Sequence, residues 1–349
     1  MNPIRTNETR LTGFEILRLI SIVLILLMHT YGMVDRDSVN GSNAFIGTII
    51  NSVGNIGVTC FVLISGYFGV SFSRAKFVRL IYLTTLYALF VYIGRLTYSD
   101  NVSLYAALMT VPLYSNWFIT CYLILMLLGD YINDFTERLP KAAFTKLVIT
   151  LFVLFCVIPA LFEITSDTVV ADRGKSLVYF LFIYIVGRYI RLHADNKVKT
   201  GTSLFLFLLM TSIITVGDLL TISEGKHLSN DNSPFILISA LSVFFLFSHC
   251  KYRVSWINFV AGSALSLYLL EGLRLPLSHY IFHIDTLGKS SSLIVAMLEL
   301  IGLYIAIALI IDIPRRLFLV KYENKAINKL FAISRWGMGR GRKWLKELD

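Results

Sequence analysis

Ten long blocks of apolar residues, separated by short polar segments, constrain the fold of this chain more than any other sequence feature. A helix needs about 20 apolar residues to cross the hydrocarbon core of a bilayer, and fewer where it borders a cavity. The blocks therefore predict an all-α, polytopic transmembrane helical bundle of about ten spans. The predicted spans are 14–34, 45–70, 77–97, 116–131, 144–163, 176–191, 203–222, 235–250, 257–273 and 292–313.

The composition leaves little room for a separate soluble domain. The chain is 56% hydrophobic and 15% charged, whereas a soluble domain has about 45–50% apolar and about 25% charged residues. We therefore predict one transmembrane domain over 1–314 and a basic cytoplasmic tail over 315–349. The apolar segment 102–114 is too short to span a bilayer, and it is typical of a re-entrant or interfacial segment.

The first apolar block is predicted to stay in the mature protein as a span. It carries Glu15 and Arg18, and no small-residue cleavage site follows it, so it does not resemble a signal peptide. Three of the four cysteines lie within apolar blocks and none forms a CxxC pair, which argues against a disulfide or a metal site.

The distribution of Lys and Arg predicts the orientation of the bundle. With the N-terminus inside, the inner segments hold 24 of these residues and the outer loops hold six. This bias follows the positive-inside rule and places both termini in the cytoplasm, in a multi-pass protein of the cell membrane. It also accounts for the net charge of +10 without a nucleic-acid partner. The tail either binds anionic lipid headgroups, with Trp336 and Trp344 at the interface, or is simply basic.

Three ionisable residues lie on one face of the first predicted span. His29 follows Arg18 by 11 residues, which is about 20° past three helical turns, and Glu15 is three residues before Arg18. Ionisable groups inside a bilayer are costly and usually functional. The face is therefore predicted to line a polar cavity, although a histidine that only joins two spans by a hydrogen bond is the alternative.

Six short motifs resemble, in order, those of the acyltransferase-3 family of integral membrane proteins. The first has an acidic residue, then Arg, then ten residues, then His. The motifs are Gly13-Phe14-Glu15-Ile16-Leu17-Arg18 with His29, Asn55-Ile56-Gly57-Val58 with Ile64-Ser65-Gly66-Tyr67, Lys76-Phe77-Val78-Arg79, Asn116-Trp117-Phe118-Ile119, Ser266-Leu267-Tyr268-Leu269-Leu270, and Ile311-Asp312-Ile313-Pro314.

The resemblance implies an enzyme that moves an acyl group, usually acetyl, from cytoplasmic acyl-CoA to a hydroxyl of a cell-surface carbohydrate. It maps the family's Arg and His of the first span to Arg18 and His29, and its cytoplasmic basic pair to Lys76 and Arg79. The chain departs from the family in two places. Lys76 replaces an Arg, and Glu271 stands where many members have a His.

Acyl transfer needs a base for the acceptor hydroxyl and a site for the donor. We predict that His29 is the general base, and that Arg18 and Glu15 position it or bind the donor. Arg74, Lys76 and Arg79 are predicted to bind the CoA phosphates; the alternative is that this loop is basic only because of membrane topology.

The candidate residues for the acceptor are less specific. Trp117 and Tyr122 are expected either to stack on a sugar ring or to pack between helices. Glu271 and Arg274, three residues apart, are expected to pair with each other or to bind a sugar. Ser65 next to Gly66 is typical of close helix contact rather than of a nucleophile.

Two other functions fit a charged multi-span bundle. A transporter or flippase for a lipid-linked sugar is the main alternative, although such proteins usually show repeat symmetry, which this sequence lacks. A polysaccharide polymerase ranks third, because all predicted outer loops are short. The sequence indicates neither the acceptor sugar nor the oligomeric state.

Overall fold

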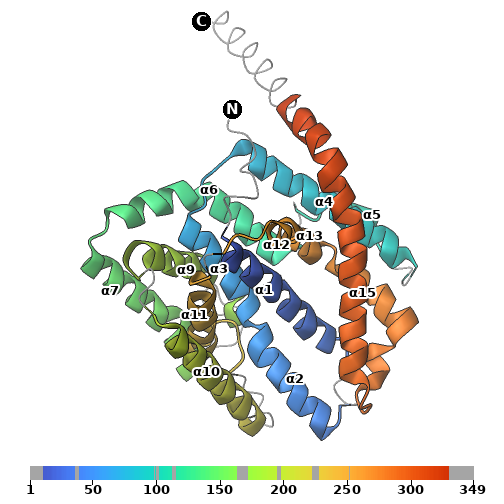
Figure 1. The fold of residues 1–349 in the computed structure, drawn as a ribbon, viewed down its shortest axis with the longest axis horizontal. Helices are drawn as coiled ribbons and strands as arrows, with labels where there is room; N and C mark the ends of the chain where they lie inside the picture. The colour runs from blue at the N-terminus through green and yellow to red at the C-terminus, as the bar shows by residue number, and fades with distance from the viewer. Residues whose placement is uncertain are drawn as a thin grey trace, which may run out of the picture.

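The computed structural model describes residues 11–35, 39–97, 99, 102–111, 115–162, 172–194, 198–221, 228–250 and 252–329. Every element of regular structure within these residues is helical, which confirms the all-α prediction (Figure 1). The helices are α1 Thr12–Tyr31, α2 Gly41–Gly54, α3 Ile56–Phe68, α4 Arg74–Leu96, α5 Leu104–Leu108, α6 Trp117–Arg138, α7 Lys141–Phe152, α8 Ile158–Leu161, α9 Leu177–Tyr189, α10 Thr200–Thr221, α11 Pro234–Ser248, α12 Ser255–Ala261, α13 Ala264–Leu269, α14 Arg274–Leu277 and α15 Leu293–Pro314.

All ten apolar blocks are mainly helical over their described residues, but two of them differ from a long uninterrupted span. Eight helices in the described part of the chain are long and apolar enough to cross a membrane. The block at 235–250 forms α11, which has only 15 residues. The block at 257–273 is broken, because Ser255–Leu269 and Glu271–Phe282 meet at an angle of 67°. A helix can break at membrane depth only where other protein segments satisfy its backbone.

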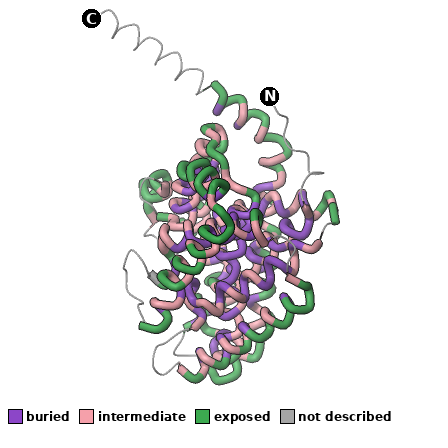
Figure 2. The backbone as a smooth tube through the Cα atoms, turned by 90° about the vertical axis from the view of Figure 1, so that its left-hand side faces the viewer, coloured by how far each residue is buried: buried purple, intermediate pink, exposed green. Residues whose placement is uncertain are grey.

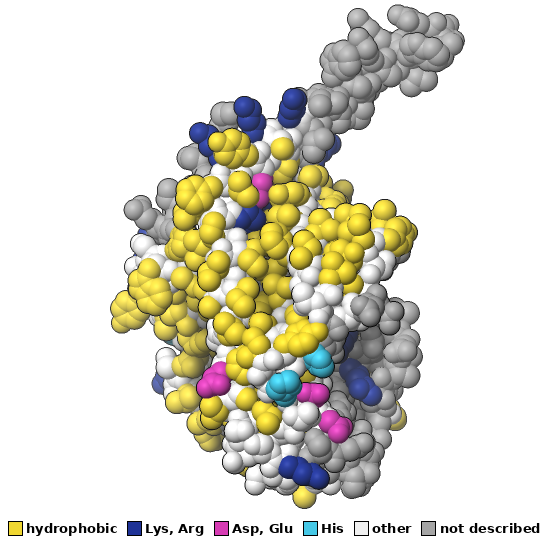
Figure 3. Space-filling model, turned by 90° about the vertical axis from the view of Figure 1, so that its right-hand side faces the viewer, with side chains coloured by type: hydrophobic (Ala, Val, Ile, Leu, Met, Phe, Trp, Pro, Cys, Tyr) yellow, Lys and Arg dark blue, Asp and Glu magenta, His cyan; other side chains and the backbone are white. Residues whose placement is uncertain are grey.

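The surface has the distribution of side chains expected of a membrane protein. On the face shown in Figure 3, hydrophobic side chains form a broad belt, and Lys and Arg gather beyond one edge of it. His, acidic and basic side chains lie beyond the other edge (Figure 3). In a bilayer, the belt would face lipid and the charged zones would face the headgroups and water.

Helix α1 runs through the middle of the bundle, where the buried residues concentrate (Figures 1 and 2). It contacts α2, α3, α11, α12, α13 and α15. Leu17, Ile22 and Leu26 are completely buried in these contacts. Because α1 is enclosed, the polar residues on it must pair with neighbouring helices or line an internal site.

A crossing of two small residues brings α3 and α9 together. A Cβ added to Gly66 would lie 2.2 Å from the carbonyl oxygen of Tyr184, and one added to Gly187 would lie 2.6 Å from that of Leu63. Small residues allow backbones to approach this closely in membrane bundles. The contact predicted next to Ser65 is therefore present, and Ser65 itself donates a hydrogen bond to the Phe61 carbonyl within α3.

The last helix does not end at the Asp312-Ile313-Pro314 motif. Helical structure continues from α15 to Lys329, giving one helix of 37 residues. Within this helix Arg315 pairs with Asp312 at 2.9 Å and with Glu323 at 2.9 Å. Arg315 also donates to the Tyr87 hydroxyl of α4 at 2.7 Å, which joins the continuation to the bundle. Pro314 is tolerated because a π-helical turn at Arg315–Leu319 follows it. Tail residues 330–349, with Trp336 and Trp344, lie outside the described residues.

Candidate active site around His29

The bend in the ninth apolar block places a carboxylate against the histidine of α1. Nδ1 of His29 lies 2.5 Å from Oε1 of Glu271, although 242 residues separate them in the chain. His29 is in the last turn of α1, and Glu271 is the first residue after the bend. The His29 side chain keeps 42% of its surface exposed, so a substrate can reach its other ring nitrogen.

Arg274 holds Glu271 in position. Its NH2 group donates to the same Oε1 at 2.5 Å, and its NH1 group donates to the Leu26 carbonyl at 3.1 Å and to the Thr30 hydroxyl. The Arg274 side chain is only 2% exposed. Glu271 and Arg274 therefore do pair, and the arginine also joins the bent segment to the last two turns of α1.

The three residues have the geometry of a supported general base. A carboxylate on Nδ1 favours the tautomer with the proton on Nδ1, which leaves the lone pair of Nε2 free to accept a proton. The carboxylate also stabilises the imidazolium that forms when Nε2 is protonated. Because Arg274 keeps Glu271 ionised and oriented, the group can take a proton from a hydroxyl and return it to a leaving group.

Glu15 and Arg18 pair with each other rather than with His29. NH1 of Arg18 donates to Oε1 of Glu15 at 2.7 Å, and the carboxylate side chain is almost fully buried. The continuous helix α1 keeps Arg18 on the face of His29 but roughly 16 Å below it along the axis. The Glu15–Arg18 pair therefore lies toward the opposite end of α1 from the His29 site.

The predicted donor-binding residues lie at the start of α4. Arg74 and Lys76 are exposed there. Arg79 is partly buried, and its guanidinium donates to the Asn324 side chain in the continuation of α15. The basic group is thus open to solvent on one side and covered by the last helix on the other.

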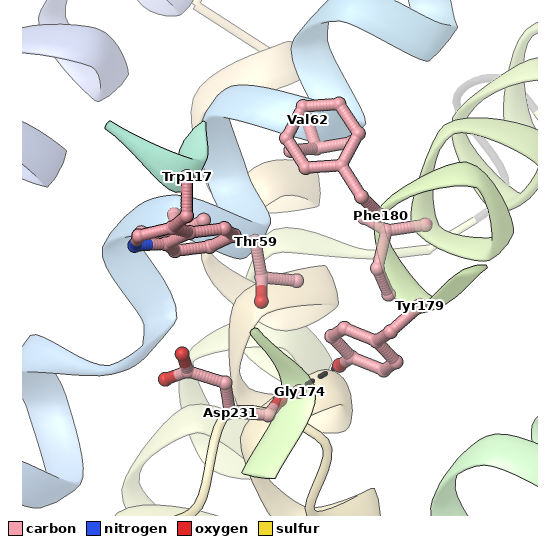
Figure 4. A pocket seen from close by; sticks show the side chains of 9 residues that line it. Thr59, Val62, Trp117, Gly174, Tyr179, Phe180 and Asp231 are labelled. Atoms are coloured by element: carbon pink, nitrogen blue, oxygen red, sulfur yellow. Dashed lines mark hydrogen bonds between the residues drawn. The ribbon is translucent and has the colours of Figure 1, made fainter. Parts of the chain in front are cut away.

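The two predicted aromatic residues have different surroundings. Tyr122 packs inside the bundle, where its ring stacks on Phe118 with centroids 6.3 Å apart. Trp117 begins α6 and lines a narrow pocket between α3, α6 and α9 (Figure 4). Asp231 and Thr59 also line this pocket. Both side chains are half-buried, and of the two only Trp117 lines this pocket.

The contact between His29 and Glu271 could not have been predicted from sequence patterns. The contact depends on the 67° bend, and no regular helix through 257–273 would predict it. The sequence did indicate that Glu271 and Arg274 are functional candidates, because burying charged side chains at the end of an apolar block costs free energy. Asp231 was missed altogether, since it lies in a short polar loop. No group of three metal-ligating side chains occurs among the residues that the structure describes.

The comparisons with known proteins gave one finding. A family model described as an acyltransferase domain matches residues 11–314. The match covers α1 to α15 and includes every residue of the site described above. No curated protein and no solved structure gave a significant match.

Proposed function

This chain belongs to the acyltransferase family whose domain model it matches, and on that premise we propose that it transfers an acyl group from acyl-CoA to a carbohydrate hydroxyl. The acyl group is most simply acetyl, and the acceptor is a cell-surface or lipid-linked carbohydrate. The protein acts in the cell membrane as a multi-pass enzyme with both termini in the cytoplasm. The charge bias of the loops supports this orientation.

The observation that carries the proposal is the contact between His29 and Glu271. A histidine with a carboxylate at 2.5 Å on Nδ1 and an accessible opposite nitrogen suits proton transfer from a weakly acidic hydroxyl. A histidine that only joined two helices would not need an accessible second ring nitrogen, whereas the His29 side chain stays 42% exposed. This arrangement, on a chain of the acyltransferase family, supports acyl transfer over transport.

In the proposed reaction, His29 alone first accepts and then returns the proton. Nε2 of His29 takes the proton of the acceptor hydroxyl while the hydroxyl oxygen attacks the thioester carbonyl carbon. A carbon–oxygen bond forms, the carbon–sulfur bond breaks, and the protonated His29 gives its proton to the departing CoA sulfur. Glu271 offsets the positive charge on the ring during the transfer, and Arg274 keeps Glu271 in place.

The donor is proposed to enter from the side of Arg74, Lys76 and Arg79. These cations would bind the CoA phosphates, with Lys76 as a point charge rather than a bidentate fork. Arg18 and Glu15 would lie beside the path of the pantetheine arm. The arm would carry the thioester over the roughly 16 Å that separates Arg18 from His29.

Membrane vesicles from cells that express the protein, supplied with radiolabelled acetyl-CoA, test this function. We expect label in the carbohydrate fraction, and none in vesicles without the protein. Intact acetyl-CoA and unlabelled carbohydrate, with the protein present and folded, would contradict the proposal. Movement of a lipid-linked sugar under those conditions would instead support a transporter or flippase.

A further inference from the structure

Asp231 is a buried acidic residue in the segment between α10 and α11. It is 9% exposed, and no hydrogen bond or ion pair joins its side chain to any residue that the structure describes. Burial of an unpaired carboxylate is costly. Proteins retain such groups mainly where a ligand, rather than the fold, uses them.

The loop that carries Asp231 is firmly held, so the unpaired side chain is not the result of a loose segment. Tyr179 donates to the Asp231 carbonyl at 2.7 Å, and Asn55 donates to the Ser229 carbonyl at 2.5 Å. Asp218 accepts a hydrogen bond from the Leu228 backbone. Helix α9, the turn between α2 and α3, and helix α10 thus bind the backbone of this loop, and none of these hydrogen bonds uses the Asp231 carboxylate.

The carboxylate points into the pocket that Trp117 lines. Figure 4 shows the Asp231 oxygens directed away from Tyr179, below the plane of the Trp117 indole, with the Thr59 hydroxyl on the same side. The pocket is narrow and has room for about one water-sized group. It therefore admits one polar substituent of a ligand, while the exposed part of the ligand stays beside the tryptophan.

The pocket lies within electrostatic reach of His29. Burial raises the pKa of Asp231 to about 7, and the positive charges of Lys175 and protonated His29 oppose that shift. Packing contacts also connect the two places. A Cβ added to Gly54 would lie 2.7 Å from the side chain of Met28, the residue before His29, and the adjacent Asn55 binds the loop that carries Asp231. The carboxylate and the general base therefore belong to one neighbourhood.

We propose that Asp231, Trp117 and Thr59 form a subsite that binds the acceptor carbohydrate. The Asp231 carboxylate accepts a hydrogen bond from one sugar hydroxyl, the Thr59 hydroxyl binds the same group, and the Trp117 ring covers an apolar face of the sugar. The reacting hydroxyl then lies toward His29. This inference rests on the proposed acyltransferase function and adds the residues that recognise the acceptor.

The vesicle reaction with radiolabelled acetyl-CoA separates acceptor binding from donor chemistry. Two products are counted, label bound to carbohydrate and label released as free acetate by hydrolysis. In Asp231→Asn, assayed above the pKa of Asp231, we expect the ratio of bound label to free acetate to fall about tenfold or more, because a charged hydrogen bond to the acceptor is lost. Asp285→Asn, which removes an exposed carboxylate from the loop before α15, should leave the ratio unchanged.

Each other outcome contradicts the subsite. An unchanged ratio in Asp231→Asn, or an equal loss of both products at a normal protein level, would overturn the assignment. If Asp231→Asn does not accumulate, Trp117→Leu replaces it and must lower the same ratio. A wild type that labels no carbohydrate and releases no acetate would overturn the proposed function and this subsite together.

Discussion

The proton position on His29 depends on a single carboxylate oxygen. Oε1 of Glu271 contacts Nδ1 of His29 and accepts from Arg274, so one atom connects the base to a buried cation. In Glu271→Gln, the side-chain amide keeps the shape but loses the charge that stabilises the imidazolium. Its NH2 group can also donate to Nδ1 and favour the unreactive tautomer.

We therefore expect Glu271→Gln to lower the turnover number for acetyl-CoA by about 100-fold or more, with little change in KM. Single-turnover measurements on purified protein would separate this loss from product release. A variant with normal turnover would show that Glu271 is only structural. A large rise in KM alone would assign Glu271 to substrate binding.

Asp231 should make the stability of the protein depend on pH. Its pKa is about 7 in the folded protein, because burial disfavours the charged form, and near 3.8 when unfolded. The unfolded state therefore loses its proton first, and the free energy of unfolding falls as pH rises from about 4 to about 7, by up to about 4 kcal/mol. Asp231→Asn should remove this fall.

Thermal unfolding in detergent at a series of pH values measures the effect. The difference between wild type and Asp231→Asn is the informative quantity, since other groups titrate in both proteins. A difference that does not change between pH 4 and pH 7 would mean that Asp231 is charged in the folded state.

For single residues of the candidate site, the sequence predicted some positions and missed others. The stripe of Glu15, Arg18 and His29 could be predicted, because helical periodicity fixes which residues share a face. The partner of His29 could not, because it comes from another helix after a bend. Loop residues such as Asp231 give no periodic signal, so their burial cannot be foreseen.

At the scale of elements, the crossing of α3 and α9 supports the site indirectly. Gly66 lies against the backbone of Tyr184, which cannot move aside as a flexible side chain would. We expect Gly66→Ala to destabilise the protein by about 1–3 kcal/mol through overpacking. Gly302→Ala is a matched control in α15, where no atom lies within 4 Å of the added Cβ, and it should be neutral or slightly stabilising.

Melting temperatures of the two alanine variants in the same detergent test this contact. Equal melting temperatures would show that α3 and α9 separate without cost. The sequence predicted the contact from Ser65 and Gly66, because small residues are rarely needed elsewhere in a span. It did not predict that the ninth block bends, since a continuous apolar run looks the same whether straight or broken.

At the scale of the whole molecule, the proposed donor-binding residues and the proposed general base lie in different parts of the bundle. Basic residues gather at the start of α4, and His29 lies at the opposite end of α1 from the Glu15–Arg18 pair. The overall bundle and its family could be predicted from apolar blocks and ordered motifs. The extension of the last helix to Lys329 could not be predicted, because a proline such as Pro314 usually ends a helix and π-helical turns have no sequence signature.

This arrangement predicts that changes at the basic residues affect the KM for acetyl-CoA, whereas changes at His29 affect the turnover number. Arg74→Gln combined with Lys76→Gln should raise the KM for acetyl-CoA about tenfold with the turnover number nearly unchanged, because two exposed charges bind the donor in both ground and transition states. Arg138→Gln is the control, since Arg138 is exposed at the end of α6 and pairs with Asp134. An unchanged KM would mean that the loop is basic only for topology.

The most direct test of the account is the turnover of radiolabelled acetyl-CoA by purified wild type and His29→Ala, with His279→Ala as an exposed histidine outside the site. All three proteins must show the same thermal unfolding. We expect the rates of both hydrolysis and transfer to fall at least about 100-fold in His29→Ala. His279→Ala should match the wild type. Full activity in folded His29→Ala would contradict the central claim that His29 is the general base.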